Sequence, residues 1–136
     1  MGRDHVIPQL LERAHRLTEG DDFDVYSVDH SRTFCYVEDA VEMIFLLSTR
    51  DAALGQVSNV GTQAPEIQMG DLARIVLNTV GRSATIVPRP APPGSPIRRV
   101  PDMAYCRQLT GYTSDVSLED GIAKSYQWYR PRFEEA

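Results

Sequence analysis

Six prolines and one glycine fall within residues 88–101. Proline fixes φ and lacks a backbone N–H, so it interrupts helices and is excluded from central strands. This segment is therefore expected to be an extended, irregular connection. A connection of this length in a compact domain is usually functional or mobile, which makes it a place to look for functional side chains.

Apolar residues at helical spacing predict five helices around this segment. Glycines at 20, 55 and 81 fit the stops of the first three helices, and Pro131 predicts the end of the last. In the second helix, the buried side is expected to contain Ala40, Val41, Ile44, Phe45 and Leu47. The predicted helices cover residues 5–19, the stretch opening at 37–39, part of 66–80, 103–109 and 118–129.

Short runs of β-branched and aromatic residues predict strands between the helices. These runs are residues 23–26, 33–36, 56–60 and 85–87. The alternation predicts a mixed α/β fold with short strands, in a single domain over residues 1–136.

Composition narrows the function classes. The net charge is −5, with both signs interspersed, which argues against a nucleic-acid partner. The longest apolar run, residues 43–47, is too short to span a membrane, and charged residues at the start argue against a signal peptide. We therefore expect a cytoplasmic protein without a membrane partner. The two cysteines and three histidines show no metal-ligand spacing, so no metal is predicted.

The motifs of a dinucleotide-dependent oxidoreductase are absent from this sequence. The nine glycines form no Gly-x-Gly-x-x-Gly or Gly-x-x-Gly-x-x-Gly turn that could hold a dinucleotide. Lys124 is the only lysine, and Asp120 stands four residues before it, so a Tyr-x-x-x-Lys acid/base pair is impossible. No catalytic or cofactor-binding residue is predicted within this chain.

Three stretches in order nevertheless resemble the C-terminal part of the extended short-chain dehydrogenase/reductase family. They are Val25-Tyr26 with Arg32-Thr33-Phe34-Cys35-Tyr36-Val37-Glu38-Asp39, then Val57-Ser58-Asn59-Val60-Gly61, then Arg98-Arg99-Val100-Pro101-Asp102. The resemblance covers about residues 5–130 and is strongest to the epimerases, dehydratases and decarboxylases of UDP- or dTDP-sugars. It implies a substrate-binding domain, with NAD held by an N-terminal domain that this sequence lacks.

In the resembling family, an arginine at the position of Arg32 touches the diphosphate of the sugar nucleotide. A guanidinium matches two phosphate oxygens and stays charged. The alternative is an ion pair with Asp29 or Glu38. The preceding loop, residues 27–31, contains no glycine, unlike the usual family pattern, and this leaves the sugar preference open.

Arg98 and Arg99 form the second candidate, because the resemblance implies an arginine here that reaches the phosphates from the opposite side. The residues alone do not choose between the two, and the alternative is a solvated loop. The third candidate is an apolar wall for the nucleobase, implied by the resemblance for Val6, Ile7, Pro8, Val25 and Tyr26. Packing in the core is the alternative for this set. Trp128 is expected in the core as well.

Three functions remain open from the sequence. The chain could be the substrate-binding part of an NAD-dependent sugar-nucleotide enzyme completed by a separate NAD-binding chain. It could instead be a module that binds a nucleotide sugar without turning it over, or a structural remnant. Alone, the chain should expose apolar faces, and we expect either self-association or a partner such as an N-terminal Rossmann-type chain.

Overall fold

The computed structural model describes residues 5–134. Its elements confirm the predicted mixed α/β class. In chain order they are α1 Val6–Arg16, β1 Asp22–Tyr26, β2 Ser31–Arg32, α2 Val37–Thr49, the 3-10 turn η1 Asp51–Ala53, β3 Ile67–Gln68, α3 Met69–Val80, β4 Thr85–Arg89, β5 Arg98–Arg99, α4 Ala104–Thr110 and α5 Leu118–Glu134.

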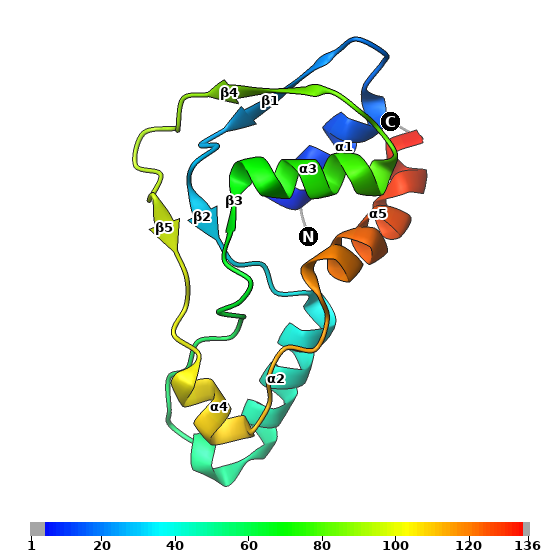
Figure 1. The fold of residues 1–136 in the computed structure, drawn as a ribbon. Coiled ribbons are helices and arrows are strands. Elements are labelled where there is room, and N and C mark those ends of the chain that lie inside the picture. Colours follow the sequence, from blue (N-terminus) through cyan, green and yellow to red (C-terminus); the bar gives the residue numbers. More distant parts are fainter. Residues whose placement is uncertain (1–4, 135–136) are drawn as a thin grey trace.

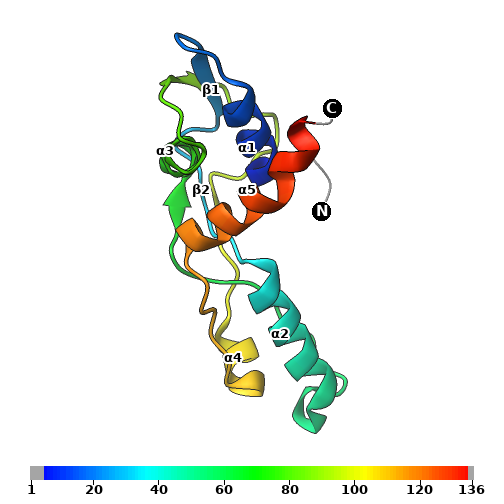
Figure 2. The ribbon, with the colours of Figure 1, turned by 90° about the vertical axis from the view of Figure 1, so that its right-hand side faces the viewer.

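Two parts of unequal size make up the molecule (Figure 1). We call the part formed by α1, α3, α5, β1 and β4 the large lobe, and the part formed by α2, η1 and α4 the small lobe. The view in Figure 2 shows the small lobe extending from one end of the large lobe. The three-stranded sheet β3-β2-β5 lies along the connection between them.

The large lobe has a continuous apolar core because α1, α3 and α5 present one apolar face each to the others. Leu11, Leu72 and Val76 are completely buried at the centre. β1 and β4 pair in parallel and close the core, with Phe23 and Val25 turned inward. This lobe has the packing expected of an independent hydrophobic unit.

The small lobe has only a minor core, in which Met43 of α2 packs with Met103 and Cys106. A buried carboxylate adds a polar anchor. Asp39 accepts hydrogen bonds from the Tyr112 hydroxyl at 2.7 Å and from the backbone N–H groups of Asp115 and Val116 at 3.0 and 3.3 Å. These bonds tie the start of α2 to the chain that leads into α5.

The predicted C-terminal ends of the first and the last helix need correction. The first helix ends at Arg16 rather than residue 19, because Thr18 donates from its backbone and its hydroxyl to the Asp21 carboxylate and forms a turn. The last helix continues through Pro131 to Glu134. Phe133 is buried and stacks on Tyr129, so packing holds the turn beyond the proline.

Two predicted strands are wrong. Residues 33–36 are not a strand, because the pairing falls one step earlier, at Ser31 and Arg32. Residues 56–60 have no partner strand within residues 5–134 and stay irregular. The expected buried side of α2 is also wrong for Val41, Ile44 and Phe45, which are all more than half exposed. No helix in the described part of the chain has both the length and the apolar character needed to cross a membrane.

Candidate phosphate and nucleoside site

Sheet β3-β2-β5 brings the predicted arginines together across a gap of more than sixty residues in sequence. β2 and β5 are parallel, and the register pairs Ser31 with Arg98 and Arg32 with Arg99. Neighbours in register point to the same face of a sheet, and successive residues point to opposite faces. Arg32 and Arg99 therefore share one face, while Arg98 belongs to the other.

Arg32 is held in one orientation by the proline-rich segment. Its guanidinium donates to the carbonyl oxygens of Ser31 at 2.7 Å, Pro96 at 2.5 Å and Ile97 at 3.3 Å. A longer contact of 3.4 Å reaches the Ser95 hydroxyl. The irregular segment thus supplies the carbonyl groups that fix this side chain.

The charge of Arg32 is not neutralised within residues 5–134. No carboxylate there forms an ion pair with it, and Glu38 instead pairs with Lys124 at 2.7 Å. Burial and then the positive charge of Arg99 lower the pKa of Arg32 from its usual value. Two cations on one face, one of them held by neutral acceptors, form a place that favours an anion.

Arg98 differs from Arg99 in its partners. Its guanidinium donates two bonds of 2.8 Å to the carboxylate of Glu66. The Ser31 hydroxyl donates to the same carboxylate. Hydrogen bonding from Arg98 and then Ser31 lowers the pKa of Glu66. Arg98 is thus already engaged, whereas the Arg99 side chain has no carboxylate partner in the part of the chain that the structure describes.

Arg99 opens onto a shallow cavity of about 350 Å³ beside the segment that follows β2. Its walls combine polar and apolar side chains. The lining residues are Thr33, Cys35, Val60, Gly61, Thr62, Arg99, Val100 and Pro101. Arg99 lines this cavity, whereas Arg32 is not among its lining residues.

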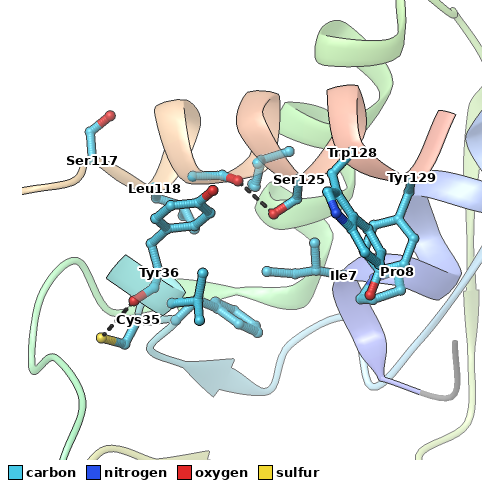
Figure 3. Close-up of a pocket in the computed structure, with 13 residues that line it drawn as sticks. Ile7, Pro8, Cys35, Tyr36, Ser117, Leu118, Ser125, Trp128 and Tyr129 are labelled. Atoms are coloured by element: carbon cyan, nitrogen blue, oxygen red, sulfur yellow. Dashed lines mark hydrogen bonds between the residues drawn. The ribbon is translucent and has the colours of Figure 1, made fainter. Parts of the chain in front are cut away.

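A second, apolar cavity of about 330 Å³ lies between the start of α1, residues 34–37 and α5. Figure 3 shows Trp128 and Tyr129 of α5 beside Pro8, and Tyr36 beside Leu118 further along the cavity. Gly121 leaves room for Tyr36, since a Cβ there would approach the Tyr36 ring to 3.3 Å. Cys35 lines both cavities, so they flank the same short stretch of chain.

The residues predicted to form one apolar wall lie in different parts of the structure. Ile7 and Pro8 line the apolar cavity, and Val6 packs against the large core. Val25 lies in that core with an exposed fraction of 1%. Tyr26 is half exposed at the end of β1. The structure therefore brings Ile7 and Pro8 together but does not place Val25 or Tyr26 with them.

Sequence reasoning missed part of the cavity. Trp128, expected in the core, is 52% exposed, and Arg132 lies over its ring at 3.6 Å. Gly121, Ser125 and Trp128 follow one another at helical spacing on α5 and all line the cavity. That spacing could have predicted a shared surface on α5, but the same spacing is equally typical of residues that face the core.

No family model matches the chain. Curated relatives do match it over 92% of its length. It is 31% identical to the GDP-L-fucose synthase of Escherichia coli strain K12 over 137 residues, and 30% identical to a putative GDP-L-fucose synthase of Arabidopsis thaliana over 128 residues. The chain spans about two fifths of these relatives, 42% and 38% of their length.

Solved structures show the same fold. An epimerase from Methanothermobacter thermautotrophicus superposes with a TM-score of 0.86 at 23% identity, over 98% of this chain and 39% of that one. The UDP-glucuronic acid 4-epimerase of Bacillus cereus, in complex with UDP-glucuronic acid and NAD, gives 0.83 at 21%, over 96% and 41%. The chain is related to the C-terminal part of the extended short-chain dehydrogenase/reductases. The family resemblance noted in the sequence is thereby confirmed. Arg32, the first residue of the resembling motif, lies on β2.

Proposed function

We propose that this chain holds the nucleoside diphosphate of a sugar nucleotide for an NAD-dependent epimerase, dehydratase or decarboxylase. Arg32 and Arg99 bind the diphosphate from one face of the β2–β5 pair. The observation that carries the proposal is their direct pairing in register without a carboxylate between them. The relatives' names and the neighbour bound to UDP-glucuronic acid support the same ligand class.

NAD does not fit the residues described here. The short strands are not followed by a glycine-rich turn opening a helix, which is the element that receives a dinucleotide. We therefore assign NAD to a different unit, either a separate chain or a further part of a longer polypeptide. The role of this chain is to fix the nucleotide so that the sugar points toward that unit.

The apolar cavity is the proposed place for an uncharged part of the ligand, with Ile7, Pro8 and Trp128 as contacts. Aromatic faces accept a base or a sugar by stacking. Val6, Val25 and Tyr26 stay predictions for the nucleobase wall, and we rank them below Ile7 and Pro8 because of their positions. Arg98 ranks below Arg99 because Glu66 engages it. A cytoplasmic location also stays a prediction.

Isothermal titration of the chain with UDP, dTDP, GDP and the corresponding nucleosides tests the proposal. We expect diphosphates to bind and nucleosides to bind at least about tenfold more weakly, because charged hydrogen bonds to phosphate contribute most of the affinity. High salt should weaken diphosphate binding. Equal affinity for a nucleoside and its diphosphate would contradict the proposed role of the arginines.

A further inference from the structure

Arg32 is the less accessible of the two paired cations. Its exposed fraction is 9%, whereas Arg99 is exposed and lines the shallow cavity. Residues 95–97 of the proline-rich segment cover Arg32 and supply acceptors to its guanidinium. An anion in the cavity therefore has direct access to Arg99, while Arg32 lies behind this cover.

The contacts of Arg32 use the N–H groups that a phosphate would need. Each Nη atom of a guanidinium carries two N–H groups. Nη1 donates to the carbonyl oxygens of Ser31 and Ile97. Nη2 donates to the Ser95 hydroxyl and to the Pro96 carbonyl oxygen. A bidentate grip on a phosphate pairs Nη2 with either Nη1 or Nε, so Arg32 can form one only after Nη2 has left residues 95 and 96.

Little apolar packing opposes a displacement of residues 95–97. The connection between β4 and β5 runs along the outer edge of the molecule (Figure 1), and the Ile97 side chain is 73% exposed. Two further hydrogen bonds tie the segment to the start of β2. The Ser31 N–H donates to the Ile97 carbonyl at 2.9 Å, and His30 Nδ1 lies 3.2 Å from the Ser95 hydroxyl. Segments with few buried apolar contacts and exposed hydrogen bonds open locally at a low free energy.

A diphosphate is a stronger acceptor for Arg32 than the groups it would replace. The carbonyl and hydroxyl oxygens of residues 95–97 are neutral, and a hydrogen bond to a charged phosphate oxygen is about twice as strong as a neutral one. An anion beside Arg99 would also relieve the repulsion between the two guanidinium groups, which are register partners. Without an anion, the neutral acceptors keep Arg32 covered.

We propose that residues 95–97 cover the phosphate-binding N–H groups of Arg32 in the free chain and that a bound diphosphate displaces them. The proline-rich segment then opens as the ligand enters, and Arg32 joins Arg99 on the phosphates. This inference rests on the proposed function, because it takes the diphosphate as the displacing ligand. The alternative is a segment that stays in place and orients Arg32 for the ligand. The two arrangements predict opposite effects of loosening the segment.

Isothermal titration of the full chain with UDP measures that effect. Pro96→Gly keeps the carbonyl group but raises the entropic cost of ordering the segment. We expect this variant to bind UDP about fivefold more tightly, since displacing the segment costs less. Ser95→Ala removes the hydroxyl next to Nη2 and should tighten binding about twofold. The controls Pro90→Gly and Ser83→Ala make the same changes outside residues 95–97 and should leave the affinity unchanged. Thermal unfolding of each variant controls for folding.

A fluorine probe reports the movement itself. 4-Trifluoromethylphenylalanine replaces Ile97, whose exposed side chain leaves room for it, and its ¹⁹F resonance is recorded with and without UDP. Arg32→Gln removes the guanidinium and gives the resonance of the released segment in the absence of ligand. We expect UDP to move the resonance of the chain with Arg32 toward that position. Uridine, which lacks the diphosphate, should leave the resonance unchanged.

The outcomes separate this inference from the proposed function. If UDP binds and Pro96→Gly weakens binding or leaves it unchanged, the inference is wrong and the proposed function stands. An unmoved ¹⁹F resonance in the chain saturated with UDP has the same meaning. If UDP binds to neither the wild type nor Pro96→Gly, the proposed function is wrong and the inference falls with it. Binding to Pro96→Gly alone would support both, since the cover over Arg32 would then be what blocks the site.

Discussion

Arg32 and Arg99 are register partners on parallel strands, so two guanidinium groups share one face of a small sheet. Like charges in this arrangement repel. Burial, and then the charge of Arg99, lower the pKa of Arg32. Carbonyl oxygens of the proline-rich segment hold Arg32 in place despite this repulsion. In the proposed site, a bound diphosphate would offset this cost, because its charge attracts both groups.

Glu66 should weaken nucleotide binding in the wild-type chain, because its carboxylate engages Arg98 next to the site. Glu66→Gln removes a negative charge and releases Arg98. We expect diphosphate affinity to rise a few-fold in isothermal titration. Glu12→Gln, on the distant helix α1, is the matched control and should leave the affinity unchanged. Weaker binding in Glu66→Gln would instead show that Glu66 orients Arg98 for the ligand.

Asp39→Asn should destabilise the chain by about 2–3 kcal/mol, because the amide cannot accept all the hydrogen bonds that the buried carboxylate receives. Chemical denaturation measures the change. Asp115→Asn alters an exposed carboxylate in the same region and should change stability little. A similar loss in both variants would mean that the net charge, and not the Asp39 hydrogen bonds, stabilises the small lobe.

Acid should remove the contribution of Asp39. Burial alone raises the pKa of this carboxyl, but hydrogen bonds from Tyr112, Asp115 and Val116 outweigh burial and lower the pKa below 3.8. A lowered folded-state pKa gives stability that is present above the unfolded value and is lost as the pH falls through the folded value. Below about pH 4 the stability gap between wild type and Asp39→Asn should therefore narrow. A constant gap down to pH 2 would contradict this assignment.

The Tyr112 phenol should ionise at a higher pH than an ordinary tyrosine. Its hydrogen bond to Asp39, with smaller effects of burial and nearby acidic groups, raises the pKa of Tyr112 to about 12. A raised folded-state pKa gives stability that is present below the unfolded value near 10 and is lost as the pH rises from 10 to 12. Ultraviolet titration of tyrosinate should show one tyrosine that ionises at this higher pH, and this step should be absent from Tyr112→Phe. Its ionisation near pH 10 would mean that the bond to Asp39 is not formed.

Gly70→Ala should destabilise the large lobe by about 1–2 kcal/mol, because overpacking outweighs the gain in helix propensity. A Cβ at Gly70 would lie 2.8 Å from Cγ2 of Val28, a stiff side chain, in a place where the Gly70 N–H also bonds to the Val28 carbonyl at 3.0 Å. Adding Val28→Ala to Gly70→Ala should recover part of the loss in thermal unfolding. No recovery would show that the backbone contact, and not the side chain, sets the limit.

Periodicity in the sequence predicts α1, α3, α5, β1 and β4 well, because each has one apolar face and packs within the large lobe. It fails for α2, since both sides of this helix are apolar and the pattern alone does not reveal which side α4 covers. It also fails for residues 56–60, whose β propensity has no neighbouring strand to satisfy it among the described residues.

The candidate site was likewise predicted only in part from the sequence. The residue types and the family resemblance single out Arg32 and the Arg98-Arg99 pair. The register of β2 with β5 and the ion pair between Arg98 and Glu66 then distinguish Arg99 from Arg98. A register shift of one residue exchanges the two side chains across the sheet, and no local pattern in a two-residue strand fixes it. Trp128 escapes prediction because its exposure depends on where α5 meets residues 34–37.

A double-mutant cycle on UDP binding tests the central claim most directly. Isothermal titration compares wild type with Arg32→Gln, Arg99→Gln and the double variant, and Arg82→Gln, an exposed arginine just beyond α3, is the control. We predict that each single variant at the site weakens UDP binding about tenfold or more, that the two effects are coupled, and that uridine binding hardly changes. Unchanged UDP affinity in Arg32→Gln and Arg99→Gln, or an equal loss in Arg82→Gln, would contradict a diphosphate site on β2 and β5.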